Sequence, residues 1–446
     1  MKTTTFANRH IGIGEEELPL MLKKIGVSSL DELIEKTIPA NILLKEPLKL
    51  GAAMTEREFA EHIGKLAAQN KLYKTYIGCG WYDTVTPAVV QRNVFENPVW
   101  YTSYTPYQAE ISQGRLEALL NFQTVISDLT ALPLANCSLL DEATAAAEAA
   151  TMMYGLRSRA QQKAQANVLF VDEEIFPQTL AVIRTRAIPQ GMVVKVGSYK
   201  DLTFTPDIFG CIVQYPNNSG SIEDYREFAE QAHAAGCKVA VAADILSLAL
   251  LVPPGEWGAD IACGDGQTLG MPLNFGGPYV GYLAATRDLV RKLPGRIVGA
   301  TTDVDGKRAF VLTLQAREQH IRRQKANSNI CSNQSLMALY VTIYMALMGK
   351  QGMKEVNEKS YAGAHYLCDK LLETGKFSLC FDKPFLKEFA VKTTLNRDTL
   401  LKHLEEKGFL AGIPVEGTDD ALLFCVTEKR TREEIDNLVS LIEKEG

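Results

Sequence analysis

The sequence contains no C-x-x-C pair and no cluster of histidines, although its 446 residues include nine cysteines and six histidines. The cysteines are scattered along the chain and their number is odd. Zinc sites need cysteine and histidine ligands at short, characteristic spacings, so we expect no metal site. Dispersed cysteines without such spacing are typical of reduced thiols, which indicates a reducing compartment.

Long blocks of positive charge and long apolar runs are also lacking. The net charge is −6, and the basic stretches at 184–187 and 321–325 are too short to indicate a nucleic-acid-binding face. The second stretch, IRRQK, is compatible with contacts to phosphate or carboxylate groups and equally with a solvated helix face. The longest apolar run, Val239–Pro254, is interrupted by Asp244 and is too short to span a bilayer. The N-terminal residues have no apolar signal-peptide core, so we expect a cytoplasmic protein without membrane contacts.

The length of the chain exceeds that of a single hydrophobic core, so several domains are expected. We predict an N-terminal helical arm over residues 1–75, a large α/β domain over 76–330 and a small α/β domain over 331–446. The arm is expected either to wrap a partner subunit or to pack on its own domain. Three capping-box patterns predict helix starts: Ser29-x-x-Glu32, Thr55-x-x-Glu58 and Thr431-x-x-Glu434.

Short apolar runs alternate with helical patterns through the middle of the chain. This alternation predicts a mainly parallel sheet with helices on both faces. The expected strands of the large domain are Val168–Val171, Met192–Val196, Cys211–Gln214, Val239–Ala243 and Tyr279–Ala284. Those of the small domain are Glu388–Val391 and Leu422–Val426.

The most informative absence is that of lysine between Lys238 and Lys292. The buried strand over 239–243 ends on Asp244. Pyridoxal-phosphate enzymes use a carboxylate in such a place to hold the protonated pyridine nitrogen, and about two dozen residues later they place the lysine that binds the cofactor aldehyde. Here that neighbourhood offers Gln267 and Thr268, and a hydroxyl cannot form an imine. The chain therefore looks like the scaffold of a cofactor enzyme without its covalent anchor.

Two other segments resemble parts of a cofactor site. The segment Ala135–Ala147 contains Ser138 and leads into an alanine-rich helix, whose free N–H groups and dipole would favour a phosphate. Asp141 and Glu142 occupy the same turn, so an ordinary acid-capped helix is an equal alternative. Phe176 follows a strand, at a position where a ring often stacks on a planar cofactor, although a core phenylalanine is the more common case.

Four runs of the sequence are distinctive. They are TYIGCGWYDTVTPAVVQRNVFENPVWYTSYTPYQAEISQGRLEALLNFQTVISDLTALPLANCSLLDEATAAAEA, CIVQYPNNSGSIED, GDGQTLGMPLNFGGPYVGYLA and REQHIRRQKANSNICSNQSLMA. They resemble the signature of the glycine cleavage P-protein family, glycine dehydrogenase (decarboxylating). The similarity covers essentially the whole chain, and runs of this length are highly specific. It implies the fold-type-I, aspartate aminotransferase-like architecture of pyridoxal-phosphate transferases.

The resemblance implies a family built from two homologous halves, with the cofactor-bearing lysine in the other half. The half that starts with RHIG and carries YTPYQAEISQGRLE is subunit 1. Its implied partners are the lysine-bearing subunit 2, in a heterotetramer, and lipoyl H-protein. The implied reaction decarboxylates glycine and passes the aminomethyl group to the lipoyl arm. Pyridoxal phosphate would be held covalently by the partner half, so this chain alone is expected to be inactive.

Active sites of this fold type lie at a dimer interface, so loops of this chain are expected to complete the partner's pocket. The residues expected to do so are Tyr104, Thr105, Tyr107, Gln108, Arg317, His320, Arg322 and Lys325. For the aromatic loop, interface packing without catalytic contact is the alternative. The vestigial cofactor pocket is expected to contain Ser138, Phe176, Asp244, Gln267 and Thr268. Many family members have His-Pro-Gln-Thr where this chain has Phe-Pro-Gln-Thr, which favours an empty pocket in this half.

Two other interpretations stay open. A self-sufficient pyridoxal-phosphate decarboxylase would need a displaced lysine, such as Lys292 or Lys307. A scaffold would dock H-protein and order subunit 2 without touching the substrate. The N-terminal sequence FANRHIG is as typical of long fused P-proteins as of free subunits, so the chain is compatible with being the first half of a longer one.

Overall fold

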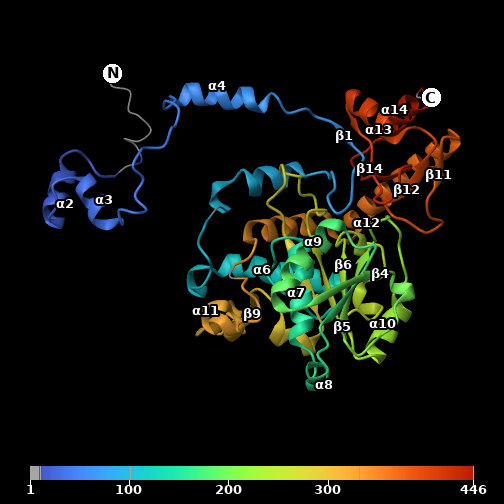
Figure 1. Cartoon of the computed structure of the whole chain (residues 1–446), viewed down its shortest axis with the longest axis horizontal. Coiled ribbons are helices and arrows are strands. Elements are labelled where there is room, and N and C mark those ends of the chain that lie inside the picture. Colours follow the sequence, from blue (N-terminus) through green and yellow to red (C-terminus); the bar gives the residue numbers. More distant parts are fainter. Residues whose placement is uncertain (1–9, 11, 101, 331, 445–446) are drawn as a thin grey trace. The chain divides into compact units, whose positions relative to one another are not determined.

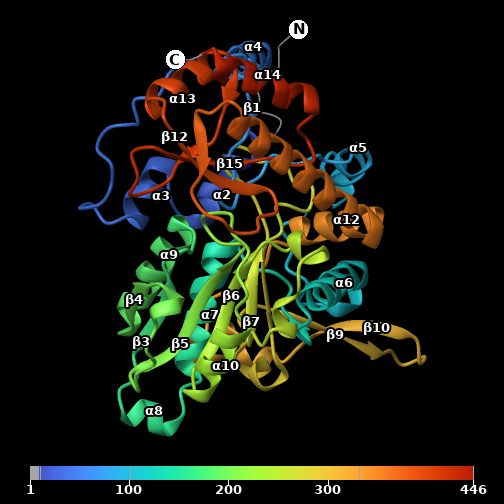
Figure 2. The same ribbon diagram turned by 90° about the vertical axis from the view of Figure 1, so that its right-hand side faces the viewer.

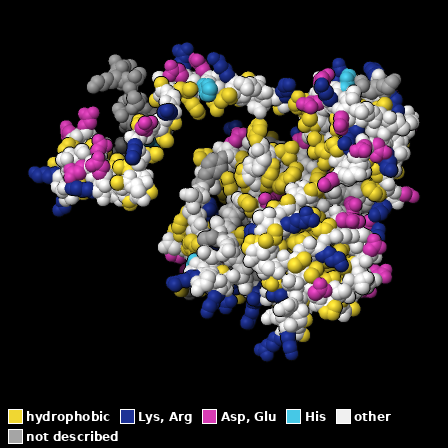
Figure 3. Space-filling model, in the orientation of Figure 1, with side chains coloured by type: hydrophobic (Ala, Val, Ile, Leu, Met, Phe, Trp, Pro, Cys, Tyr) yellow, Lys and Arg dark blue, Asp and Glu magenta, His cyan; other side chains and the backbone are white. Residues whose placement is uncertain are grey.

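The computed structural model describes residues 10, 12–100, 102–330 and 332–444. The chain divides into two compact units, residues 1–72 and residues 73–446. The first unit contains the helices α2 (Glu17–Ile25), α3 (Leu30–Thr37) and α4 (Glu56–Ala67), drawn in blue in Figure 1. Within these three helices Leu22 is the one buried residue. Hydrophobic side chains are exposed along one side of α4 (Figure 3).

The helix starts of the first unit follow the predicted caps, with one correction. The Thr55 hydroxyl accepts a hydrogen bond from the Glu58 N–H, and the Glu58 carboxylate accepts one from the Thr55 N–H at 2.7 Å, so this capping box is confirmed. Ser29 accepts from the Glu32 N–H at 3.1 Å, but the Glu32 carboxylate binds Ser28 instead. The predicted box at Ser29 is therefore wrong in its second half, because Ser28 offers that carboxylate both a hydroxyl and an N–H.

The second unit is built on a seven-stranded sheet with the order β2-β8-β7-β6-β5-β3-β4. Neighbouring strands from β7 to β4 are parallel, whereas β8 is antiparallel to both of its neighbours. The strands are β2 (Leu134–Ala135), β3 (Val168–Asp172), β4 (Val193–Gly197), β5 (Ile208–Tyr215), β6 (Lys238–Ala243), β7 (Ile261–Asp265) and β8 (Gly281–Ala285). The predicted mainly parallel sheet is confirmed. Two of its strands were not predicted: the short edge strand β2, and β7, directly beside β6.

The central strands of this sheet bury both faces. In β6, Ala240 and Ala242 belong to one hydrophobic core, and Val239 and Val241 belong to the other. Figure 2 shows the sheet between α7 and α6. The first core includes α7 (Glu142–Gly155) and α9 (Pro177–Ala187), and the second includes α6 (Gln113–Thr130) and α10 (Arg226–Ala234). The alanines of α7 are buried, and their small side chains allow close approach to the sheet.

A second sheet, of four antiparallel strands, follows the long helix α12 (Ser335–Glu373), which bends at Gly349. Its order is β11-β12-β15-β14. The elements are β11 (Phe377–Leu379), β12 (Glu388–Thr393), β14 (Ile413–Pro414), β15 (Ala421–Cys425), α13 (Arg397–Glu406) and α14 (Arg432–Glu443). The capping box predicted before α14 is confirmed. The boundary expected near residue 330 stays a prediction, because residues 73–446 form one compact unit.

Three smaller features complete the second unit. The strands β9 (Ile297–Thr302) and β10 (Arg308–Thr313) form an antiparallel hairpin, followed by the short helix α11 (Gln319–Arg322). The strand β1 (Lys74–Thr75) pairs in parallel with β13 (Phe409–Leu410). Two short helices are α5 (Ala88–Val90) and α8 (Arg159–Lys163). Within the described part of the chain, no helix has the length and apolar character needed to cross a membrane.

Candidate functional site

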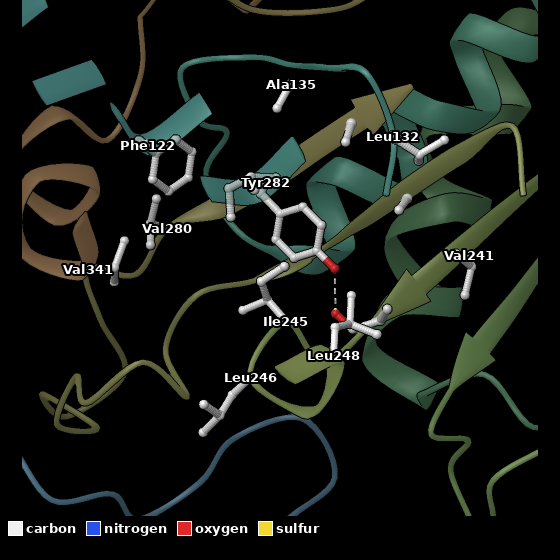
Figure 4. Close-up of a cluster of buried hydrophobic side chains, with 14 of the residues drawn as sticks. Phe122, Leu132, Ala135, Val241, Ile245, Leu246, Leu248, Val280, Tyr282 and Val341 are labelled. Carbon is white, nitrogen blue, oxygen red and sulfur yellow. Dashed lines mark hydrogen bonds between the residues drawn. The ribbon is translucent and has the colours of Figure 1, made fainter. Parts of the chain in front are cut away.

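Strand β6 places Asp244 at the carboxyl end of the seven-stranded sheet. The strand is apolar and buried over 239–243, and Asp244, which follows it, is only 9% exposed. Tyr282 of β8 crosses β7 and donates a hydrogen bond of 2.7 Å to the Ala243 carbonyl (Figure 4). It can do so because β7 has Gly264 at the crossing, where a Cβ atom would lie 2.6 Å from the Tyr282 ring. The end of β6 is therefore fixed one residue before Asp244.

Both carboxylate oxygens of Asp244 have partners from this chain. Its Oδ1 accepts hydrogen bonds from the Thr268 hydroxyl at 2.9 Å and from the Leu246 N–H at 3.2 Å. Its Oδ2 lies 2.6 Å from Nζ of Lys387, which is also buried. Burial alone would lower the pKa of Lys387, but the attraction of Asp244 outweighs it and the pKa lies above its usual value. Asp244 and Lys387 thus form a buried ion pair.

The loop before α5 covers this ion pair. Nζ of Lys387 lies 3.5 Å from the centroid of the Tyr82 ring, a cation–π contact. The Tyr82 N–H donates to the Gln267 side chain at 3.0 Å, and the Gln267 amide donates to the Tyr82 carbonyl at 2.7 Å. The Tyr82 hydroxyl donates to Glu388 at 2.7 Å, and the same carboxylate accepts from the Cys79 N–H at 2.6 Å. The space above Asp244 is therefore filled by protein.

Phe176, predicted as a possible stacking ring, packs against the same loop. It is buried, and a Cβ atom on Gly80 would lie 3.2 Å from its ring. Gln178, two residues later, donates to the Cys79 carbonyl at 2.7 Å. Phe176 and Gln178 thus fix the covering loop from the side of α9.

The alanine-rich helix α7 begins with carboxylates. Asp141 caps it, accepting a hydrogen bond from the Thr144 N–H at 2.8 Å. Glu142 is buried, and burial raises its pKa to about 7, although the hydrogen bond donated by Thr179 at 2.9 Å opposes this shift. The sequence allowed either a phosphate cradle or an ordinary acid-capped helix over Ala135–Ala147, and the structure shows a helix capped by Asp141. The hydroxyl of Ser138 accepts from the Gln334 N–H at 3.0 Å and so is used elsewhere.

A third carboxylate, Asp265, lies at the end of β7. Its Oδ1 accepts from the Gln267 N–H at 2.6 Å, and among the described residues its buried Oδ2 has no hydrogen-bond partner. Burial raises the pKa of Asp265 well above its usual value, and the charges of Glu142 and Asp141 raise it further. The start of α7 is therefore surrounded by acidic groups.

These residues do not fit pyridoxal phosphate. The cofactor needs a carboxylate that can accept the pyridinium N–H, a cradle that attracts its phosphate dianion and an amine for its aldehyde. In this chain Asp244 is paired with Lys387, the start of α7 carries Asp141 and Glu142, and Thr268 has no amine. The structure thus brings Asp244, Gln267 and Thr268 together as predicted, but around a lysine instead of a ligand cleft.

The aromatic loop lies apart, on the surface. Tyr104 is exposed, and its hydroxyl is 3.1 Å from the Gln108 side chain and accepts from the Gln108 N–H at 3.3 Å. Arg115 of α6 donates to the Tyr104 carbonyl at 3.1 Å. The half-buried Thr105 accepts at its carbonyl from the Tyr107 N–H at 2.7 Å. The loop is therefore ordered by its own contacts while it presents two tyrosines to solvent.

Tyr107 connects this loop to the segment around α11. Arg296 donates to the Tyr107 hydroxyl at 2.9 Å and lies 4.7 Å from its ring centroid. The His320 ring lies edge-on to the Tyr107 ring at 5.7 Å, and its Nδ1 is 3.5 Å from Glu318. Arg317 donates to the backbone carbonyls of residues 293 and 295, which fixes the start of this segment. The two predicted groups of residues, more than 200 residues apart in the sequence, thus meet at Tyr107 and His320.

The remaining predicted cations, Arg322 and Lys325, are exposed on and just after α11. Figure 3 shows Lys and Arg side chains gathered over this helix. These cations are therefore available to an anionic group from outside the chain.

The two lysines considered as displaced Schiff-base residues lie elsewhere. Nζ of Lys292 is 3.1 Å from the Asn327 side chain. Lys307 is exposed in the turn between β9 and β10, 3.6 Å from Asp305. Among the described residues, the one lysine that pairs with Asp244 is Lys387, which the sequence pattern did not single out. Its ammonium contacts the carboxylate that, in a pyridoxal-phosphate enzyme, would accept the pyridinium N–H.

Comparison with known proteins gives a consistent result. A family model described as "Glycine cleavage system P-protein" matches residues 8–442. Glycine dehydrogenase (decarboxylating) of Bacteroides thetaiotaomicron is 63% identical over 375 residues, which are 84% of this chain and 40% of that protein. The Nostoc punctiforme protein of the same name is 53% identical over 357 residues, 80% of this chain and 36% of the relative. The chain thus spans about two fifths of the length of these curated relatives.

Solved structures agree. A crystal structure of glycine decarboxylase (P-protein) of the glycine cleavage system, in inhibitor-bound form, is 38% identical with a TM-score of 0.88, covering 97% of this chain and 99% of that chain. A Lactobacillus brevis glutamate decarboxylase, 14% identical with a TM-score of 0.65, covers 92% and 98% and shares the fold. The fold is that of fold-type-I pyridoxal-phosphate enzymes, as predicted. The chain belongs to the glycine cleavage system P-protein family.

Proposed function

We propose that this chain is the lysine-free half, subunit 1, of a glycine decarboxylase of the glycine cleavage system. Together with a lysine-bearing half, joined to it or separate, it would decarboxylate glycine and pass the aminomethyl group to lipoyl H-protein. The observation that carries this assignment is the Asp244–Lys387 ion pair in a chain of this family. Because this pocket does not fit pyridoxal phosphate, the cofactor must be held by the other half, where it supplies the electron sink for loss of CO₂.

The proposed contribution of this chain is made by its surface loop. Tyr104 and Tyr107 are exposed, and the His320 ring lies edge-on against the Tyr107 ring. Phenol and imidazole groups can orient a substrate or hold a proton, and Arg322 and Lys325 can attract its carboxylate or a phosphate. This arrangement supports a loop that completes the other half's active site and excludes water from it.

The cytoplasm is the proposed compartment. Nine dispersed cysteines without paired spacing support a reducing environment.

Reconstitution tests the assignment. Isotope exchange between glycine and bicarbonate in the presence of H-protein should be absent with this chain plus pyridoxal phosphate, absent or weak with the lysine-bearing half, and strong with both. Borohydride treatment with the cofactor should label the lysine-bearing half. Exchange activity of this chain purified alone, or a specific adduct on it, would instead support a self-sufficient decarboxylase.

A substitution tests the loop. Tyr107→Phe removes the hydroxyl and keeps the ring, so turnover of the assembled enzyme should fall by roughly tenfold or more, the cost of one well-placed hydrogen bond. Tyr366→Phe is the matched control, because the Tyr366 hydroxyl is exposed and binds Asp436 within the chain. Unchanged turnover of Tyr107→Phe with unchanged assembly would leave this chain as a scaffold for the other half and H-protein.

A further inference from the structure

The place that would hold the cofactor has the opposite charge pattern to the one that pyridoxal phosphate requires. A pyridinium cation needs a free carboxylate, but Asp244 already has the Lys387 ammonium at 2.6 Å. A phosphate dianion needs N–H groups and cations, but the start of α7 is capped by Asp141, with the buried Glu142 next to it. At one end of this place the Lys387 ammonium already neutralises the carboxylate that a pyridinium would need. At the other end, the carboxylates at the start of α7 would repel a phosphate.

The ion pair also joins the two sheets of the second unit. Asp244 follows β6 of the seven-stranded sheet, and Lys387 directly precedes β12 of the four-stranded sheet. The next residue, Glu388, binds the Tyr82 hydroxyl and the Cys79 N–H, so both residues attach β12 to the covering loop. A side chain on Gly78 would collide with Glu388, with a Cβ distance of 2.0 Å, which shows how closely the two parts approach.

We propose that the former cofactor pocket is an ionic clamp: Lys387 permanently replaces the pyridinium at Asp244, fastens the four-stranded sheet to the seven-stranded sheet and keeps pyridoxal phosphate out. This inference deepens the proposed function and rests on it where the cofactor is assigned to the other half. The clamp itself depends on residues of this chain alone.

A double-mutant cycle in the full-length chain tests the clamp. Lys387→Met leaves the buried Asp244 carboxylate without its counter-ion, and Asp244→Asn leaves the buried Lys387 ammonium without its counter-ion. Each single variant should lower the melting temperature by several degrees. The double variant removes both charges and keeps similar volumes, so its loss should be clearly smaller than the sum of the single losses. Lys429→Met is the matched control: its ammonium pairs with Asp83 but is exposed, and its loss should be small.

The stabilities of the three variants decide whether Asp244 and Lys387 are coupled. If Lys387→Met does not fold, the double variant should still fold. A double variant that is no more stable than Lys387→Met, single losses that simply add, or a loss no larger than that of Lys429→Met would overturn the clamp.

Cofactor exclusion has a separate readout. The probe is 4′-deoxypyridoxine 5′-phosphate, which keeps the ring nitrogen and the phosphate but has no aldehyde, so it cannot react with surface lysines. Equilibrium dialysis should show no saturable binding to this chain and one site on the lysine-bearing half. Saturable binding to this chain would overturn the exclusion. If the losses of stability in the cycle simply add while the reconstituted enzyme is active, the clamp is overturned and the proposed function stands. If the losses do not add but the reconstituted enzyme is inactive, the proposed function is overturned and the clamp stands.

Discussion

The hydroxyl of Tyr282 donates a hydrogen bond to the carbonyl of Ala243, the residue immediately before Asp244. Tyr282 is fully buried in β8 and reaches this carbonyl over the intervening strand. The position of the Asp244 carboxylate is thus fixed from the opposite edge of β7. The stability of the core and the geometry of the site depend on the same contact.

Replacing Tyr282 by phenylalanine should remove this contact with little change in volume. The Ala243 carbonyl would lose a donor in a buried place, so the free energy of unfolding should fall by about 1–3 kcal/mol. Urea denaturation measures the change. Tyr279→Phe is the control: its hydroxyl also binds a carbonyl, that of Leu273, but lies where water can replace it, so its loss should be smaller. Equal losses in the two variants would contradict the special role of Tyr282.

The crossing requires a glycine in β7. In Gly264→Ala the new Cβ atom would lie 2.2 Å from the Ala243 carbonyl oxygen, which is backbone and cannot move aside. We expect a loss of about 3 kcal/mol or more, or failure to fold. Gly114→Ala in α6 is the matched control, because nothing lies within 4 Å of its Cβ position and a helical alanine should leave stability unchanged or raise it by up to about 1 kcal/mol. A tolerated Gly264→Ala would show that β7 and β8 can separate.

Glu142 should make stability depend on pH. Burial raises the pKa of Glu142 from 4.5 to about 7 in the folded chain. Between these values the unfolded chain has released the proton while the folded chain keeps it, so this group makes the folded state less stable as the pH rises through that window. Glutamine is neutral throughout and can still accept from Thr179. The stability of Glu142→Gln relative to wild type should therefore rise by up to about 3 kcal/mol from about pH 4.5 to about pH 7. A difference that does not change with pH would contradict the raised pKa.

Asp83 should matter through a partly buried ion pair. Its carboxylate lies 2.6 Å from Nζ of Lys429 and 3.2 Å from Nη2 of Arg430, whose side chain is almost fully buried. In Asp83→Asn the guanidinium loses its nearer carboxylate, so a loss of about 1–3 kcal/mol is expected in denaturant titrations. Asp398→Asn is the control, because Asp398 is exposed beside Arg397, and its loss should stay below about 0.5 kcal/mol. Similar losses would mean that the Arg430 charge is adequately solvated without Asp83.

The end of β6 could be predicted from the sequence because a buried strand leaves a simple signal. Five apolar residues followed by Asp244 mark both the strand and its carboxyl end. The neighbouring β7 gave no such signal, although all of it is buried. It is short and contains Gly264 and Asp265, residues that usually interrupt strands. Here the glycine is required by Tyr282, a contact between residues far apart in the sequence.

Lys387 could not be predicted for a similar reason. It is 143 residues from Asp244, and in the segment around β12 it looks like an ordinary solvated lysine. The absence of lysine near Thr268 is visible in the sequence, but nothing local to Asp244 shows that a distant lysine pairs with its carboxylate. The pairing depends on how the two sheets pack, which no short-range pattern encodes.

The proposed clamp would also affect how the stability of this polypeptide responds to vitamin B6 supply. A protein that binds its coenzyme only when folded gains stability as the coenzyme concentration rises and loses it during shortage. If the proposed clamp holds, the counter-charge of Asp244 is a side chain of the same polypeptide, so the folding equilibrium of this chain should not depend on that concentration. During vitamin starvation it should stay folded while its coenzyme-dependent counterpart becomes less stable.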